Sequence, residues 1–434
     1  YQDTVCYLVH YYGNTNQIVD TAKVTNGHFV FEGNKELGGG IYIVVGEKRN
    51  MVFEFIINEI KQFSISTNAS NIIGNISFKG SPENTIFYEY RKYADKKEKI
   101  VAKLLERKET YKNNIDSVNS IQKAIELINQ DVIAFKDEFI IKYPDKFICK
   151  VFKASKDPEV PNPPVLPNGR IDSAFQYYYY KNHFWDNIDL TDDRLLRTPV
   201  YHGKLKQYFE KVLVQHPDTI ILEVDKIIGK TRSNKEMFKF AVWYLTNTYE
   251  RSKLMGFDAV FVHLVEEYYM TNQAYWVTPS VLQNITKRAM TLKPLLLGEV
   301  APNLIMLDTN NRLVSLHNID ANYIVVYFWD PDCGHCKKET PKLIKFYNES
   351  KETLGVKVYA VSTDSDLNRW KKYIRDNGLN WINVNDKNNQ TNFRMVYDIT
   401  ATPVIYLLDK DKKIIAKKLF VEPMQEYLKH YLEK

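Results

Sequence analysis

The chain has 434 residues, of which 44% are hydrophobic and 26% charged, and its formal net charge is +6. This length exceeds one ordinary hydrophobic core, so roughly two to four domains are expected, and the composition excludes a disordered chain. Short lysine runs such as Lys96-Lys97 and Lys412-Lys413 alternate with acidic residues, so we expect no nucleic-acid partner. Every apolar run is shorter than the roughly 18 residues that span a bilayer.

Residues 1–155 are predicted to form a β-rich domain followed by a helical hairpin. Short alternating runs separated by turn residues favour a small antiparallel sandwich or open barrel; these runs are Phe29–Phe31, Ile41–Val44, Val52–Phe55 and Phe63–Ser66. From Glu83 the pattern becomes helical. The Asn113-Asn114 break divides it into a hairpin that ends before Pro144.

The next 140 residues divide into a linker and a helical domain. Five prolines lie between residues 158 and 167, which predicts an extended, semi-rigid linker over 156–169. Residues 170–295 are predicted to be α-helical because aromatic and leucine side chains recur at helical spacing. The candidate helices are 202–215, 234–251, 258–270 and 279–290.

Residues 296–434 alternate between strand and helix patterns, which predicts an α/β domain. The strands are expected at 324–329, 356–361, 403–408 and 413–419, and the helices at 337–349, 367–377 and the C-terminal end.

The chain has four cysteines, too few for a disulfide framework. Cys6 and Cys149 are expected to be small buried hydrophobes, and whether they pair is left open. Cys333 and Cys336 form a Cys-Gly-His-Cys motif between a strand and a helix. A helix N-terminus stabilises a thiolate, so Cys333 is the expected nucleophile and Cys336 the resolving thiol.

Three other uses of this motif find little support. A zinc site needs a second pair of ligands at a suitable spacing, so we expect no metal. Haem attachment needs a histidine after the second cysteine, where Lys337 stands, and no cofactor is expected. A peroxidase loop would place a proline seven residues before its cysteine, whereas Pro331 lies only two before Cys333.

The C-terminal segment resembles the TlpA/ResA-like branch of the thioredoxin superfamily over about 135 residues. The resemblance rests on Ala301-Pro302-Asn303-Leu304, Val326-Tyr327-Phe328-Trp329, Cys333 to Pro341 and Ala401-Thr402-Pro403-Val404. It implies a thioredoxin-like fold, with Pro403 in a cis peptide and with Thr402 and Pro403 presenting backbone groups to a substrate peptide. It also implies that Glu339 exchanges a proton with the cysteine pair, the alternative being a surface glutamate.

Two departures from the family leave the direction of electron flow open. His335 stands where many members have proline, and a histidine there can stabilise the thiolate and make the pair more oxidising. Asp330 and Asp332 act in the opposite direction, because like charges raise a thiol pKa. Tyr327 occupies the position of the buried aspartate of thioredoxin.

The upstream segments are similar to uncharacterised modules of exported oxidoreductases from Gram-negative bacteria, through Ile18–Val24 and Gly27–Gly33. The resemblance implies a periplasmic or cell-envelope location, the protein being either free in the periplasm or tethered to a membrane by a lipid at a removed N-terminus. The chain starts at Tyr1 without a targeting pattern, so we interpret it as a mature or truncated form. Its oligomeric state is left open.

We therefore expect a thiol–disulfide oxidoreductase, a reductase or isomerase rather than an oxidase. Its partners would be disulfide-bearing envelope proteins and an external thiol-redox protein. The alternative is an envelope binding or scaffolding protein with a secondary redox domain, because roughly 300 upstream residues carry no catalytic motif.

Overall fold

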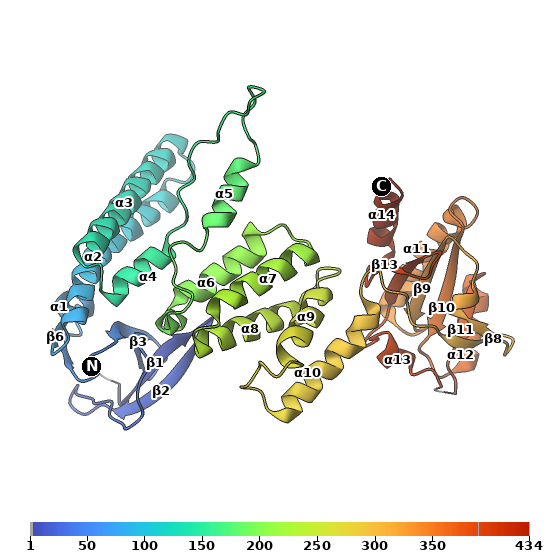
Figure 1. The fold of residues 1–434 in the computed structure, drawn as a ribbon, viewed down its shortest axis with the longest axis horizontal. Helices are drawn as coiled ribbons and strands as arrows, with labels where there is room; N and C mark the ends of the chain where they lie inside the picture. Colours follow the sequence, from blue (N-terminus) through green and yellow to red (C-terminus); the bar gives the residue numbers. More distant parts are fainter. Residues whose placement is uncertain (1–2, 389, 434) are drawn as a thin grey trace. The chain divides into compact units, whose positions relative to one another are not determined.

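A computed structural model describes residues 3–388 and 390–433; the outer ends of the first and last predicted domains, 1–2 and 434, lie outside this range. The chain folds into two compact units. The first comprises residues 1–215 with 225–241, and the second comprises 216–224 with 242–434. Figure 1 shows the fold of both, with labels on their α-helices and on several of their strands. The predicted four-segment division of the chain stays a prediction.

The first unit begins with a four-stranded antiparallel sheet in the order β2-β1-β3-β4. Its strands are β1 (Val5–Tyr12), β2 (Thr15–Lys23), β3 (Gly40–Gly46) and β4 (Met51–Ile57). A short helix, α1 (Ile72–Asn75), lies between the two strands of a separate ribbon, β5 (Ser64–Ser66) and β6 (Ser77–Lys79). The run Phe29–Phe31, predicted as a strand, is irregular. Its two phenylalanine rings pack edge-to-face on each other. Alternation of hydrophobic residues is therefore not sufficient to form a strand at this point.

The predicted helical hairpin is present as α2 (Pro82–Thr110) and α3 (Ile115–Lys142). Asn114 begins the second helix by accepting a hydrogen bond from the Ser117 backbone N–H at 3.0 Å, which explains the break at this point. A helix that the sequence did not predict, α4 (Phe147–Ser155), follows and buries Phe147, Cys149 and Phe152. Cys6 and Cys149 are both buried and free, as small hydrophobic residues would be.

The middle of the chain is helical, as predicted. Its helices are α5 (Phe175–His183), α6 (Pro199–Gln207), α7 (Pro217–Thr231), α8 (Lys235–Glu250), α9 (Asp258–Leu264) and α10 (Pro279–Leu292). Wider π-helical turns extend α6 through 208–212 and α9 through 265–269. Helices α5 and α7 were not predicted. The sequence of α7 contains several isoleucines after a proline. Because β-branched residues favour strands, this pattern does not indicate a helix.

The second unit contains a seven-stranded sheet in the order β13-β12-β9-β10-β11-β7-β8. The strands are β7 (Ile305–Asp308), β8 (Leu313–Ser315), β9 (Tyr323–Trp329), β10 (Val356–Ser362), β11 (Ile382–Asn385), β12 (Val404–Asp409) and β13 (Ile414–Lys417). The helices are α11 (Gly334–Ser350), α12 (Leu367–Asn377), α13 (Phe393–Val396) and α14 (Val421–Leu432). Strand β9 pairs in parallel with β10 and antiparallel with β12, so it is central.

Alternation along β9 divides the core of this sheet between its two faces. Val325, Tyr327 and Trp329 pack with residues of α11, α12 and α14, whereas Val326 and Phe328 pack with the segment before β7 and with α13. A central strand buried on both faces reads as a continuous apolar run, as this one does. The predicted fold class is confirmed: a β-rich region, a helical middle and a C-terminal α/β sheet of thioredoxin type.

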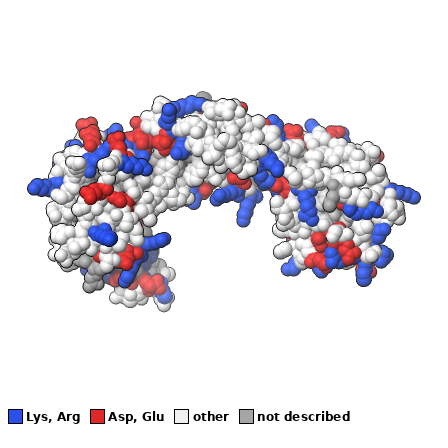
Figure 2. All heavy atoms as spheres, turned by 90° about the horizontal axis from the view of Figure 1, so that it is seen from below, with Lys and Arg blue, Asp and Glu red and all other residues white. Residues whose placement is uncertain are grey.

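Within the described residues, no helix is long and apolar enough to cross a membrane. On the face shown in Figure 2, lysine and arginine side chains are interspersed with aspartate and glutamate.

Candidate functional site

The two cysteines of the motif lie where β9 ends and α11 begins. Cys333 is the N-cap residue of α11, and its sulfur accepts a hydrogen bond from the Cys336 backbone N–H at 3.2 Å. The same sulfur donates to the Thr402 carbonyl oxygen, also at 3.2 Å. The buried strand therefore delivers the first thiol to the positive end of a 17-residue helix.

The environment of Cys333 favours its thiolate. Partial burial acts to raise the pKa of this thiol, but hydrogen bonds from Cys336, from the Thr402 hydroxyl and from the His335 backbone outweigh it. The pKa of Cys333 consequently lies below its ordinary value. A partly exposed sulfur with this property has the character of a nucleophile.

Cys336 has the opposite properties. Its side chain is only 1% exposed, and burial together with the hydrogen bond to Cys333 raises its pKa to about 12. At neutral pH this thiol is protonated and shielded from solvent. The two sulfurs therefore differ: that of Cys333 is partly exposed with a lowered pKa, whereas that of Cys336 is buried with a raised one.

Thr402 and Pro403 face the motif from the turn before β12. The peptide bond between them is cis, as the resemblance implies. The Thr402 carbonyl contacts the Cys333 sulfur, which shows that the structure brings together residues 69 positions apart. Both side chains are half-buried, so the turn forms part of an accessible rim beside Cys333.

Sequence reasoning missed a pair of hydroxyl groups in the core that contains Cys336. Tyr327 is fully buried, and its hydroxyl lies 3.0 Å from the Thr340 hydroxyl of α11. Burial raises the pKa of Tyr327 well above its ordinary value, so this group stays neutral. The core that contains Cys336 therefore also contains a neutral pair of hydroxyl groups.

Glu339 is buried, but its carboxylate is bound to groups other than the cysteines. One oxygen accepts from the Val421 backbone N–H at 2.9 Å, and the other accepts from the Lys342 ammonium at 3.0 Å. Val421 is the first residue of α14, and the preceding Phe420 supplies no side-chain cap. Glu339 thus caps the N-terminus of α14. Its proposed exchange of a proton with the cysteines stays a prediction.

His335 is exposed at the first turn of α11, and the two acidic residues before the motif each contact other groups. Asp332 forms ion pairs with Arg369 at 2.8 Å and with Lys337 at 3.7 Å. Asp330 accepts hydrogen bonds from the backbone of Asp332 and from the Thr363 hydroxyl. The expected raising of the Cys333 pKa by these acids is therefore not the dominant effect.

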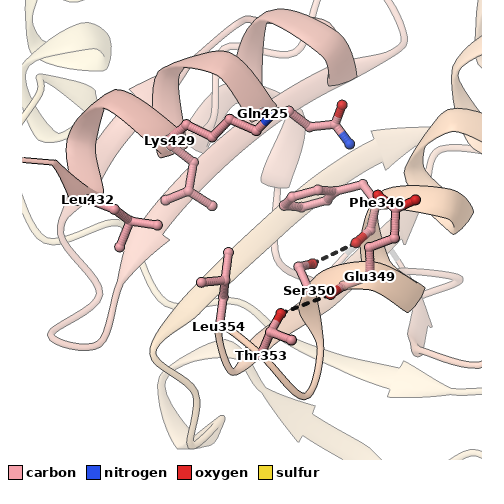
Figure 3. Close-up of a pocket in the computed structure, with 9 residues that line it drawn as sticks. Phe346, Glu349, Ser350, Thr353, Leu354, Gln425, Lys429 and Leu432 are labelled. Atoms are coloured by element: carbon pink, nitrogen blue, oxygen red, sulfur yellow. Dashed lines mark hydrogen bonds between the residues drawn. The ribbon is translucent and has the colours of Figure 1, made fainter.

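Two further observations concern possible metal ligands and a groove away from the cysteines. In the described part of the chain, no three histidine, cysteine or acidic side chains gather as metal ligands would. A groove of about 190 Å³ lies between the ends of α11 and α14, where Phe346, Leu354 and Leu432 face one another (Figure 3). Neither cysteine lines it, and its Ser350 and Thr353 hydroxyls donate to carbonyls of their own helical turn.

Comparison with known families divides the chain into three matched regions. Residues 297–417 match the AhpC/TSA family. Residues 107–290 match a domain of unknown function, DUF5106, and residues 1–87 match another, DUF4369.

Similar proteins cover the C-terminal region. A thiol-disulfide oxidoreductase ResA of Bacillus cereus is 28% identical over 138 residues, 32% of this chain and 78% of the relative. A solved domain of a possible thiol-disulfide isomerase from Cytophaga hutchinsonii is 42% identical, covering 32% of this chain and 95% of that one, with a TM-score of 0.31. The thioredoxin domain of a Bacteroides vulgatus thiol-disulfide oxidoreductase is 34% identical, covering 31% and 96%, with a TM-score of 0.29.

The family match, the ResA relatives and the dithiol at a helix N-terminus support a redox enzyme of the thiol–disulfide oxidoreductase class. The family match and the ResA relatives support a TlpA/ResA-like protein of the thioredoxin superfamily, with additional N-terminal modules upstream of the matched region.

Proposed function

We propose that the chain reduces or isomerises disulfides of cell-envelope proteins through Cys333 and Cys336. The observation that carries the proposal is the contrast between the two thiols: the pKa of Cys333 is lowered, whereas that of Cys336 is raised to about 12. Cys333 is therefore proposed to attack the substrate first, and Cys336, one helical turn further on, to react only in the second step.

In the first step the Cys333 thiolate attacks one sulfur of a substrate disulfide. A Cys333–substrate disulfide forms, and the other substrate sulfur leaves as a thiolate that takes a proton from solvent. In the second step Cys336 loses its proton and attacks Cys333, which releases the remaining substrate sulfur. The substrate has gained two electrons and the protein holds a Cys333–Cys336 disulfide, which an external dithiol protein reduces again.

Isomerisation uses the same first step with a different ending. If another substrate thiol attacks the mixed disulfide before Cys336 does, Cys333 is released unchanged and the substrate disulfide has moved. A strongly oxidising enzyme of this superfamily has a first cysteine with a pKa of about 3.5. The groups that lower the pKa of Cys333 are hydrogen-bond donors rather than a cation, which favours reduction or isomerisation.

The substrate is proposed to bind along the Thr402–Pro403 turn. Its carbonyl already contacts Cys333, so an extended peptide paired with this edge would place its disulfide against that sulfur. His335 lies exposed beside the attacking thiol and is proposed to tune its thiolate.

The proposal is tested by disulfide exchange with matched cysteine variants. Replacing Cys333 by serine is expected to abolish exchange, whereas Cys336→Ser is expected to accumulate the mixed disulfide. Cys149→Ala, which removes a buried thiol of the first unit, serves as the control with unchanged exchange. Full activity of the Cys333 variant would refute the assignment.

The direction of electron flow is decided by the reduction potential of the pair, measured by thiol alkylation in graded redox buffers. A value near about −250 mV supports a reductase, and a value near about −180 mV supports an isomerase. The proposed envelope location, based on the resemblance to exported oxidoreductases, is tested by fractionating cells that express the native gene. Recovery in the cytosol would refute it.

A further inference from the structure

Helix α10, from the region matching DUF5106, contacts the redox fold through a buried carboxylate. Both terminal nitrogens of Arg288 donate to the two oxygens of Asp398, the second at 3.2 Å. The Lys418 ammonium adds a third hydrogen bond at 2.7 Å. The Asp398 side chain is only 7% exposed, so these two cations replace its solvent.

A second contact joins helix α9 to strand β13 nearby. The ammonium of Lys417, whose side chain is 4% exposed, donates to Asp258 and to the Leu295 carbonyl, both at 2.5 Å. The Lys417 backbone N–H approaches the Met255 sulfur at 3.4 Å. The end of the helical region and the thioredoxin-like sheet thus belong to one compact unit.

Asp398 lies in the turn that leads to the cis-proline. Its backbone has φ of +52°, in the left-handed region that few residues other than glycine, asparagine and aspartate adopt. The neighbouring Tyr397 carbonyl accepts from the Tyr406 hydroxyl at 2.8 Å. Four residues after Asp398 the chain reaches Thr402, whose carbonyl contacts the Cys333 sulfur.

We propose that Arg288 is a positioning residue of the redox site: by holding Asp398 it sets the Thr402–Pro403 turn against Cys333. The inference rests on the proposed function and extends it, because it gives the end of the helical region a role in catalysis. Arg288 touches neither substrate nor sulfur and acts through the turn. The planar guanidinium suits this role, since its two parallel hydrogen bonds fix the orientation of the carboxylate.

The test replaces Arg288 by glutamine in the full chain and measures the alkylation rate of Cys333 against pH, together with disulfide exchange. A displaced turn moves the Thr402 hydroxyl, whose hydrogen bond is one of the contacts that lower the pKa of the Cys333 thiol. We therefore expect the Cys333 pKa to rise and exchange to fall by about tenfold, since a misplacement of about 1 Å can cost more than that. Lys293→Gln is the matched control, because Lys293 pairs with Glu266 within the helical region and is expected to change neither quantity.

Arg288→Lys keeps the charge but loses the paired geometry, and a partial effect is expected. If the glutamine variant fails to fold, the lysine variant decides the question by the same measurements. A folded variant with an unchanged Cys333 pKa and exchange within about twofold of the parent would overturn the inference. The two proposals can fail separately. Absence of disulfide exchange in the parent protein would refute the proposed function. The pH dependence of Cys333 alkylation would still show whether Arg288 positions the Thr402–Pro403 turn.

Discussion

Replacing Glu339 separates its structural contact from its predicted part in proton transfer. Its carboxylate accepts from the buried Val421 N–H at 2.9 Å and from the Lys342 ammonium at 3.0 Å. Glu339→Ala removes both contacts, whereas Glu339→Gln keeps an oxygen for the Val421 N–H and removes the charge. The two variants therefore test different properties of one side chain.

The structure gives a magnitude for each variant. A buried N–H left without an acceptor costs about 1–3 kcal/mol, and Val421 is fully buried. Because Lys342 is exposed, solvent screens its ion pair, which adds little to the loss. We expect Glu339→Ala to lose about 2–3 kcal/mol and Glu339→Gln about 1 kcal/mol or less. For a unit of this size each kcal/mol lowers Tm by about 3 °C, so the shifts are about 6–9 °C and 3 °C or less.

Thermal unfolding and stopped-flow kinetics of mixed-disulfide resolution decide between the two roles. If Glu339 acts as a cap alone, the glutamine variant resolves the mixed disulfide at the parental rate. If it takes the proton of Cys336, resolution slows at neutral pH and recovers as the pH rises. A glutamine variant destabilised as strongly as the alanine variant would refute the capping argument.

Three further outcomes are expected. Thr340→Val leaves the Tyr327 hydroxyl without its partner and is expected to cost about 1–3 kcal/mol in denaturant unfolding, with unchanged alkylation of Cys333. In single-cysteine variants, the alkylation rate of Cys333 is expected to rise through a pKa below that of a free thiol, whereas Cys336 stays unreactive until strongly alkaline pH; equal profiles would contradict the assignment. Lys417→Met is expected to lower the stability of the second unit by about 2 kcal/mol, as measured by thermal unfolding. The loss is smaller than for a fully buried ion pair because Asp258, its carboxylate partner, is partly exposed.

The elements of the redox fold that the sequence predicted well are those specified locally. Strand β9 is a continuous apolar run, and α12 matches its predicted bounds of 367–377. The break at Asn113-Asn114 carries its own cap, so a short stretch of sequence determines it. By contrast, Phe29–Phe31 has the alternation of a strand but takes an irregular path, since a strand also requires a neighbour to pair with.

The contacts that define the site beyond the motif connect residues far apart in sequence. Glu339 and Val421 are separated by 82 positions, and Arg288 and Asp398 by 110. A glutamate after a cysteine motif suggests acid–base chemistry, and an arginine on an amphipathic helix suggests a solvated face. Only the folded chain shows that one caps a helix and that the other binds a buried carboxylate.

The difference between the two thiols depends both on the local sequence and on contacts with residues far apart in the chain. A spacing of three residues at a helix start places one sulfur at the N-cap and the next one turn inside, where α11 packs on the sheet. That part is local, because it follows from the spacing of the two cysteines and the start of the helix. How far each pKa departs from its ordinary value depends also on the Thr402 turn, which is distant in sequence. If Arg288 holds that turn as proposed, the reactivity of Cys333 is set partly by a helix outside the thioredoxin-like fold.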